Sequence, residues 1–409
     1  MPPLEYVVTI AGAASLLCGV LTFVAALDQR RRVGRPREQC AVPVTVIIPV
    51  TGAAPSLDDL YRRLRHQTCP PTRLLLAVES ESDPAYRRAI GLAGASAFPI
   101  DVVVAGLACH GTQKCHNLAV ALRREDLLEE YVVLADADIA PEPTWLSDLL
   151  IRVQRRTADI VTGYRWPMPT AVNLPTMLYA WLDRAVATLP KWDFLGLCWG
   201  GSLAARRDTL RAMAAADVLG HAVTDDLALA DAARAQSMRV TFRSTVLLPT
   251  PAAHTWESLL AFGIRQYQFV RLYRPSAWWL AVVIVAVNLL CSDALVVLAF
   301  SSGAAALLLL ANGLVMLLIC LVRFDISMRC AATAPGPRHE WLFLLMPFAG
   351  VLLHNLHAFV LLRSWSCRQV VWGRWTYRLE GLQVVGIRRS GWGARDAAAP
   401  GEVDAVIGQ

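Results

Sequence analysis

The strongest constraint on the fold is a set of four apolar segments, each long enough to cross a lipid bilayer as a helix. A transmembrane helix needs about 20 consecutive apolar residues. The segments span residues 6–27, 278–300, 303–322 and 341–363. The chain as a whole is 55% hydrophobic, yet 18% of its 409 residues are charged. This composition predicts a membrane part joined to a soluble part.

The first apolar segment is predicted to be a membrane anchor and not a cleaved signal peptide. It is long, it begins after Glu5, and it is followed by Arg30, Arg31, Arg32, Arg35 and Arg37. By the positive-inside rule, this basic flank and the region after it stay in the cytoplasm. Only two of the 39 basic residues, Lys114 and Lys191, are lysine. This bias is typical of a GC-rich bacterial genome, so the bacterial inner membrane is favoured over a eukaryotic endomembrane.

The net charge and the cysteine spacing argue against a nucleic-acid-binding protein, a zinc-stabilised protein and a disulfide-rich protein. The net charge of +6 comes mostly from arginines beside the membrane, which favours anionic lipid surfaces over nucleic acid as a partner. Ten cysteines without Cys-x-x-Cys spacing argue against structural zinc and against a disulfide scaffold. Four spans would place the arginines between Arg363 and Arg389 outside the cytoplasm, so a re-entrant or flat-lying segment is an alternative.

The region between the first and second apolar segments alternates between strand-like and helix-like patterns. Such alternation predicts an α/β domain with a mostly parallel sheet. Helical patterns cover residues 56–66 and 116–128. The predicted strands are residues 44–50, 74–78, 101–104, 131–135 and 159–161.

The strand-like run from Tyr131 to Ala135 is followed by Asp136 and Asp138. In open α/β sheets, ligands bind beyond the carboxyl ends of the strands, and a divalent cation bridging phosphate oxygens needs hard oxygen ligands there. The pattern predicts a metal site in an enzyme that handles a nucleotide diphosphate. The alternative is that both acids only solubilise a loop and cap the helix after Pro141 and Pro143.

Two further segments place polar groups at the same edge of the predicted sheet. Glu79 and Asp83 follow the second strand, where an acid commonly accepts hydrogen bonds from a ribose or base; Asp83 before Pro84 also fits a simple turn. Lys114 and Asn117 lie at the start of a predicted helix, which suits phosphate. A single surface lysine is the alternative.

Two later motifs are also candidates. Gly200 and Gly201 let a backbone approach a sugar or lipid head closely, or they form a bulge. Thr224 precedes the acidic pair Asp225 and Asp226, in which a carboxylate is suited to act as a general base. The alternative is that Thr224 caps the helix and the acids favour its dipole.

Residues 256–276 have the pattern of an amphipathic helix at the membrane surface. Arg265, Gln268 and Arg271 fall on one face, and apolar side chains cover the other. A basic helix lying on lipid explains the pattern. The alternative is that the polar face closes the site and binds a diphosphate leaving group.

In this order, the motifs resemble those of the family 2 glycosyltransferases with the A-type nucleotide-sugar fold, most closely the ceramide glucosyltransferase group and its bacterial relatives. The likeness covers about residues 43–275 and the membrane layout. Four signatures of that group fall on Asp83, Asp136, Asp226 and the stretch from Arg265 to Phe269. The segment from Val371 to Leu379 is similar to the aromatic and basic segment that these proteins carry after the last span.

Two departures from the family pattern concern the substrates. Gln268 and Phe269 stand where the group usually has Arg and Trp, so phosphate neutralisation is weaker unless Arg271 compensates. Asp138 completes an Asp-x-Asp motif that is common in family 2, which strengthens the metal assignment. The acceptor stays open among ceramide, a hopanoid, a polyprenyl phosphate and a diacylglycerol.

The resemblance implies a Rossmann-like α/β domain and a membrane-bound inverting transferase that moves one sugar, expected to be glucose, from a UDP-sugar to a lipid hydroxyl. Asp226 is the implied base, and Asp138 with Asp136 holds Mg²⁺ or Mn²⁺. The implied substrate contacts are Glu79, Asp83 and Asn117 for the nucleoside, and Lys114, Arg265, Gln268 and Phe269 for the phosphates or the acceptor head. Rival readings are a processive polysaccharide synthase, a polyprenyl-phosphate glycosyltransferase, and a membrane scaffold or transporter without catalysis.

The predicted organisation has five parts. They are an anchor with its basic flank (1–40), a cytoplasmic glycosyltransferase domain (41–255), an interfacial helix (256–276), about three C-terminal membrane helices (277–365), and a basic and aromatic segment with a disordered tail (366–409).

Overall fold

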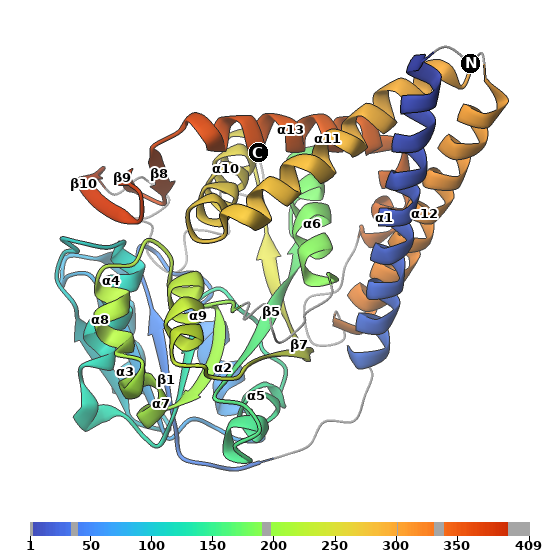
Figure 1. The fold of residues 1–409 in the computed structure, drawn as a ribbon. Coiled ribbons are helices and arrows are strands. Elements are labelled where there is room, and N and C mark those ends of the chain that lie inside the picture. Colours follow the sequence, from blue (N-terminus) through green and yellow to red (C-terminus); the bar gives the residue numbers. More distant parts are fainter. Residues whose placement is uncertain (1–2, 34–39, 190–197, 301, 331–338, 392–409) are drawn as a thin grey trace. The chain divides into compact units, whose positions relative to one another are not determined.

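The computed structural model describes residues 3–33, 40–189, 198–300, 302–330 and 339–391. The chain divides into two compact units, each built from separate stretches of sequence (Figure 1). The helical unit comprises Met1–Arg35, Trp166–Pro190 and Pro251–Cys367, and the sheet unit comprises Pro36–Arg165, Lys191–Thr250 and Arg368–Gln409. The five-part boundaries drawn from the sequence stay a prediction.

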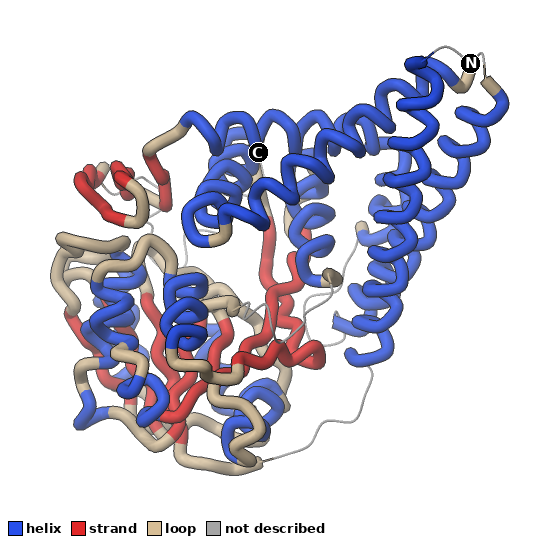
Figure 2. Tube along the Cα trace, in the orientation of Figure 1, coloured by secondary structure: helices blue, strands red, loops and turns tan. Residues whose placement is uncertain are grey.

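A seven-stranded sheet in the order β3-β2-β1-β4-β6-β5-β7 organises the sheet unit (Figures 1 and 2). Neighbours among β1 to β4 run parallel, whereas β6 runs antiparallel to β4 and β5. The strands are β1 (Val44–Pro49), β2 (Arg73–Val78), β3 (Ile100–Val104), β4 (Tyr131–Ala135), β5 (Ile160–Pro169), β6 (Ser202–Arg206) and β7 (Val240–Ala252). The predicted α/β class with a mostly parallel sheet is confirmed.

All five predicted strands are present, but the sequence pattern missed others. β1, β2 and β4 are buried almost throughout, which is why their sequences are continuous apolar runs. β5 continues to Pro169, well beyond the predicted end at Val161. β6 was missed because Ser-Leu-Ala-Ala-Arg has no marked strand propensity, and its place depends on pairing with β4.

The helices of the sheet unit pack apolar faces against this sheet. In α2, Leu57, Leu60 and Leu64 are buried at helical spacing, and α5 buries Leu146, Leu149 and Leu150 in the same core. The helices are α2 (Leu57–Arg65), α3 (Pro84–Gly94), α4 (Gln113–Leu122), η1 (Glu125–Leu127), α5 (Trp145–Gln154), α7 (Arg207–Ala212), α8 (Ala215–Gly220) and α9 (Asp225–Ala235).

Residues 369–389 form a second, three-stranded antiparallel sheet, the C-terminal meander, which also belongs to the sheet unit. Its strands are β8 (Gln369–Trp372), β9 (Trp375–Glu380) and β10 (Gln383–Arg389). Gly373 and Gly381 sit at the two turns with φ of 58° and 59°, a conformation that glycine adopts without strain. The sequence pattern predicted no strands here; the predicted disordered tail falls mostly on residues 392–409, outside the described residues.

The helical unit contains α1 (Pro3–Val33), α6 (Leu174–Ala187), α10 (Trp256–Tyr273), α11 (Pro275–Leu298), α12 (Gly303–Cys330), η4 (Glu340–Ala349) and α13 (Gly350–Ser366). Helix α1 packs along α12 and α11 (Figure 1). Among the described residues, four segments are long and apolar enough to cross a membrane: Tyr6–Val33, Pro275–Leu298, Gly303–Cys330 and Glu340–Ser366. These helices indicate a membrane protein.

Helix α12 continues for about two turns beyond the predicted end at Val322, as far as Cys330. Hydropathy stops at the first charged residue, Arg323, but the backbone helix does not. Asp325 accepts from Arg30 of α1 and from Arg329, each at 2.7 Å, so the polar end of α12 is held by charge pairs.

Candidate active site

The ammonium group of Lys114 joins two carboxylates at the carboxyl edge of the sheet. Its Nζ lies 2.8 Å from Oδ1 of Asp136 and 3.0 Å from Oδ2 of Asp225. Lys114 comes from the first turn of α4, Asp136 directly follows β4, and Asp225 begins α9. The Asp225 side chain is 3% exposed, so this is an ion-pair network inside the protein.

The two carboxylates fix the charge of Lys114. Burial opposes the ammonium form, but the charges of Asp136 and Asp225 outweigh it and hold the pKa of Lys114 above its ordinary value. Lys114 is therefore a permanent cation among acids. The sequence placed Lys114 at this edge but missed Asp225, because only the second acid of the pair matched the family signature.

Gly200 and Gly201 make this cluster possible. The backbone N–H of Asp136 donates to the carbonyl oxygen of Gly201 at 3.3 Å, and β6 pairs with β4 directly after the glycines. A Cβ atom on Gly200 would overlap the Asp225 carboxylate, and one on Gly201 would collide with Trp199 and Asp136. The glycines thus let backbone approach the protein's own carboxylates.

The carboxylate of Asp226 is hydrogen-bonded to neighbouring residues at the start of α9. Its Oδ1 accepts hydrogen bonds from the Thr224 hydroxyl and from the Leu227 N–H, both at 2.7 Å. Thr224 does not cap the helix with its side chain, contrary to the alternative reading of the sequence. Desolvation and the neighbouring Asp225 charge raise the pKa of the half-buried Asp226 to about 6. A carboxyl with such a pKa accepts and releases protons near neutral pH.

Asp138 lies at the exposed rim of the same loop as Asp136. Desolvation by surrounding residues and the charge of Asp136 raise the pKa of its carboxyl to about 6, although Arg165 and Lys114 oppose the shift. The described residues contain no group of three His, Cys, Asp or Glu side chains that would hold a metal alone. Mg²⁺ at nucleotide sites is bound by one or two carboxylates and by substrate phosphates, so Asp136 and Asp138 fit such an ion.

The C-terminal meander lies on this edge of the sheet. Glu79, which is fully buried, forms ion pairs with Arg374 and, at 3.6 Å, with Arg389. The Lys114 Nζ lies 5.8 Å from the centre of the Trp372 ring, over its face. The Tyr377 hydroxyl accepts from the Gln113 N–H at 3.0 Å.

These contacts add Trp372, Arg374 and Tyr377 to the candidate site. In the sequence, their aromatic and basic segment stood out only through its resemblance to the family. Contacts between residues more than 250 positions apart leave no local pattern, although a glycine between Trp372 and Arg374 is a turn signal.

The Glu79–Arg374 pair gives a testable stability effect. We expect Arg374→Gln to destabilise the sheet unit by about 3 kcal/mol, because it leaves a buried carboxylate without its main partner. Combining it with Glu79→Gln should restore most of the loss. Arg378→Gln, an exposed position of β9, should change stability by less than about 0.5 kcal/mol. Thermal unfolding of the full-length wild type and of these three variants measures the effects; equal effects of Arg374→Gln and Arg378→Gln contradict the expectation.

Two other predicted residues are engaged within the protein. Asp83 is buried; its Oδ1 accepts from the N–H groups of Gly52 and Ala85, at 2.8 and 2.9 Å, and its Oδ2 from the Thr51 hydroxyl. Asn117 is buried as well, donates to the carbonyl of Ala77 at 3.2 Å and accepts from Gln113 at 2.8 Å. Both side chains order the loops at the edge of the sheet, and their part in nucleoside binding stays a prediction.

The remaining predicted residues lie on α10 in the helical unit. Gln268 is buried and donates to the carbonyl of Cys367 at 3.1 Å, and Phe269 is buried beside it in the sequence. The Arg265 guanidinium lies 5.5 Å from the centre of the Phe262 ring. Their contact with phosphates or an acceptor stays a prediction.

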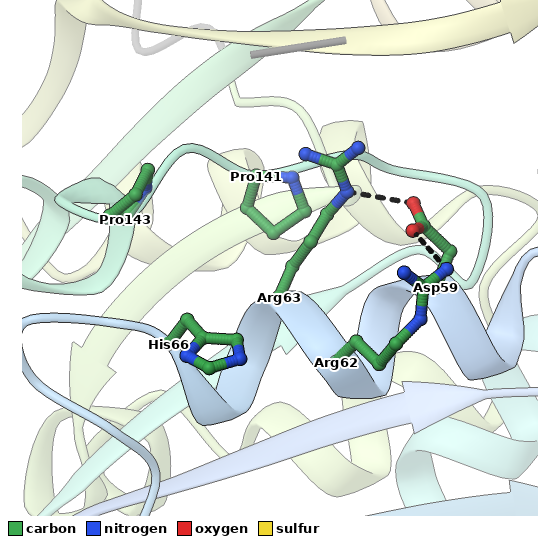
Figure 3. Close-up of a pocket in the computed structure, with 6 residues that line it drawn as sticks. All are labelled: Asp59, Arg62, Arg63, His66, Pro141 and Pro143. Atoms are coloured by element: carbon green, nitrogen blue, oxygen red, sulfur yellow. Dashed lines mark hydrogen bonds and ion pairs between the residues drawn. The ribbon is translucent and has the colours of Figure 1, made fainter. Parts of the chain in front are cut away.

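A pocket of about 220 Å³ elsewhere in the sheet unit contains none of these residues (Figure 3). Asp59 pairs there with Arg62 at 2.8 Å and with Arg63 at 2.7 Å. The lining residues are Asp59, Arg62, Arg63, His66, Pro141 and Pro143. Since its single carboxylate is already paired with both arginines, it is a weaker candidate than the Lys114 cluster.

Known proteins resemble this chain in sequence and in fold. A model of glycosyl transferase family 21 matches residues 8–383. Among solved structures, a mannosyltransferase from Pyrobaculum calidifontis in complex with GDP-Man and Mn²⁺ is 18% identical, with a TM-score of 0.51, over 87% of this chain and 99% of that chain. At this identity the similarity shows the fold alone.

A glucosyl-3-phosphoglycerate synthase from Mycobacterium tuberculosis, solved with Mn²⁺, UDP and glucosyl-3-phosphoglycerate, is 15% identical over 56% of this chain and 77% of that chain, with a TM-score of 0.35. No curated protein matches the chain.

Proposed function

Because the chain belongs to glycosyl transferase family 21, we propose that it moves one sugar, glucose, from a UDP-sugar to the hydroxyl of a lipid such as ceramide. Family 21 is a narrower assignment than the family 2 resemblance of the sequence analysis. The observation that carries the proposal is the cluster of Lys114, Asp136 and Asp225 beside Asp138 and Asp226, at the edge of the sheet where nucleotides bind.

The cluster suits the departure of a nucleoside diphosphate. Asp136 and Asp138 would hold Mg²⁺ or Mn²⁺, which would neutralise the charge that develops on the diphosphate as the anomeric bond breaks. The fold shared with a mannosyltransferase solved with Mn²⁺ supports a divalent ion. Lys114 adds a fixed positive charge beside the same phosphates, at a position set by Asp225.

Asp226 is the proposed general base. The lipid hydroxyl oxygen attacks the anomeric carbon, its proton passes to the Asp226 carboxylate, and the bond to the diphosphate breaks on the opposite side of the sugar, which inverts the anomeric configuration. The Thr224 hydroxyl and the Leu227 N–H fix the orientation of the carboxylate. The proposed site lies on the cytoplasmic side of a bacterial inner membrane, since Arg30, Arg31 and Arg32 end α1.

The experiment that tests the function uses the full-length protein in lipid nanodiscs with UDP-glucose, Mg²⁺ or Mn²⁺, and ceramide, hopanoid or diacylglycerol. Mass spectrometry of the lipids should show one added hexose, and chelation with EDTA should abolish it. A ladder of longer products would instead indicate a processive synthase, and modified polyprenyl phosphate would indicate that acceptor. Absence of any product and of any thermal shift with UDP-sugars and metal would favour a scaffold or transporter.

The raised pKa of Asp226 predicts the pH dependence. A base must be deprotonated to accept a proton, so turnover at saturating donor and metal should be full above pH 7 and fall about tenfold per pH unit below about pH 6. Initial rates of glycolipid formation between pH 5 and 8 measure this. Constant turnover down to pH 5 contradicts the assignment, because a protonated Asp226 cannot accept the hydroxyl proton.

A further inference from the structure

A second cluster of charged side chains lies inside the helical unit, apart from the residues proposed for catalysis. It contains Arg184 and Thr188 at the end of α6, Arg323 of α12 and Glu340 of η4, all buried. Two of these residues are arginines and only one is an acid. We call this set the Arg323 cluster.

The positive charge of Arg184 is neutralised by Glu340. Its two terminal nitrogens each lie 2.7 Å from one oxygen of Glu340, which is the bidentate geometry of a strong guanidinium–carboxylate pair. It also donates to the carbonyl of Pro167 at 2.6 and 3.1 Å. Both oxygens of Glu340 accept from Arg184, so Glu340 cannot form a second bidentate pair of this geometry.

The positive charge of Arg323 has no such carboxylate partner among the described residues. It is 3% exposed, and its Nε and Nη2 both donate to the Thr188 hydroxyl, at 3.3 and 3.1 Å. The guanidinium also lies 4.6 Å from the centre of the Trp181 ring. A guanidinium has five N–H donors, which lie along two edges. The edge formed by Nε and Nη2 faces the Thr188 hydroxyl, whereas the edge formed by Nη1 and Nη2 has no acceptor among the described residues.

Thr188 cannot supply the missing charge. Its hydroxyl donates to the carbonyl of Arg184 at 2.9 Å, so its oxygen is a neutral acceptor for Arg323. Within the part of the chain that the structure describes, no carboxylate forms an ion pair with Arg323. A buried cation without an anion is strongly unfavourable, and planar guanidinium edges match the oxygens of phosphates.

The position of Arg323 along α12 indicates where the anion comes from. Arg323 directly follows the apolar stretch 303–322, and Asp325 two residues later pairs with Arg30 at the basic end of α1. The apolar part of a span lies in hydrocarbon and the first charged residues lie at the level of lipid headgroups. Basic sites between membrane helices at this level suit anionic headgroups.

We propose that the Arg323 cluster binds the phosphate of an anionic membrane phospholipid through the Nη1 and Nη2 edge of Arg323. The Thr188 hydroxyl and the face of the Trp181 ring hold the guanidinium in place. The bound phosphate would supply the anion that Arg323 lacks among the described residues. This site is independent of the proposed sugar transfer.

The test compares melting temperatures of the full-length protein in nanodiscs of phosphatidylcholine, with and without phosphatidylglycerol. We expect phosphatidylglycerol to raise the melting temperature of the wild type, and Arg323→Gln to abolish this rise. Arg323→Lys keeps the charge without the two-pronged edge and should retain only part of it. Arg329→Gln is the matched control, because it removes an exposed arginine from the same end of α12 and should keep the rise.

Several outcomes would overturn the proposal. A wild type that melts at the same temperature in both lipids would mean that the chain itself supplies the counter-charge, and this arm needs no variant to fold. Equal losses in Arg323→Gln and Arg329→Gln would indicate general surface attraction. A full rise caused by inorganic phosphate in phosphatidylcholine nanodiscs would assign the site to free phosphate and not to a lipid.

Discussion

Replacing Asp226 with asparagine is expected to lower the rate of sugar transfer by about 10²- to 10⁴-fold, because the amide cannot take up the proton of the attacking hydroxyl. The side-chain oxygen of asparagine still accepts from the Thr224 hydroxyl and the Leu227 N–H, so the start of α9 should keep its structure. Single-turnover rates and UDP-glucose binding to the full-length protein measure the two effects separately.

The matched control for this substitution is Asp231→Asn, which lies in the same helix and pairs with Arg234 at 3.2 Å. It should leave the rate within about twofold, since pairs of this kind are worth little and do not touch the cluster. If Asp226→Asn turned over at the wild-type rate with unchanged donor affinity, another group would have to accept the proton. If it lost donor binding as well, the carboxylate would be acting on the substrate complex and not as a base.

Gly200→Ala is expected to be the most damaging single-methyl change in the sheet unit. The new Cβ would occupy the space of the Asp225 carboxylate, which is buried and held against Lys114 at 3.0 Å. Overpacking of this kind costs about 1–3 kcal/mol or more. Since Asp225 cannot move without breaking its contact with Lys114, we also expect a loss of donor binding.

Gly91→Ala is the control for that substitution, because a Cβ there meets nothing within 4 Å and the position is inside helix α3. It should stabilise the protein by about 0.5–1 kcal/mol. Thermal unfolding and UDP-glucose titration of both variants check the expectation. A Gly200→Ala variant with wild-type stability and donor affinity would show that the close approach to Asp225 is not required.

The parts of the fold that the sequence predicted are those governed by local pattern. The apolar runs of β1, β2 and β4 are buried on both faces, so they stand out without any knowledge of their neighbours. Asp136 and Asp138 were found because they follow such a run directly. β6 was missed because its small residues have little strand propensity and its place depends on pairing with β4. The C-terminal meander was missed although its Val, Trp, Thr and Tyr residues and its two glycine turns are a local strand signal.

The candidate site was predictable to the extent that each residue had a signal of its own. Lys114 at a helix start had one, but its link to Asp225 and Asp136 depends on three separate elements meeting in space. Glu79 was correctly predicted to lie at the carboxyl edge of the sheet. Its pairing with Arg374 was not predictable, because the two residues are too far apart in the sequence for any local rule. Asp83 and Asn117 show that a correct position does not reveal what a side chain binds.

The return of the chain to the sheet unit after its last helix has a consequence for biogenesis. Glu79 is made early, but the arginine that neutralises it belongs to residues 369–389, which follow every membrane helix in the sequence. Domains generally fold in the order in which the ribosome delivers them. Glu79 therefore stays without its arginine partner until the segment after the last helix has been synthesised, and a chain that ends before residue 374 cannot form this pair.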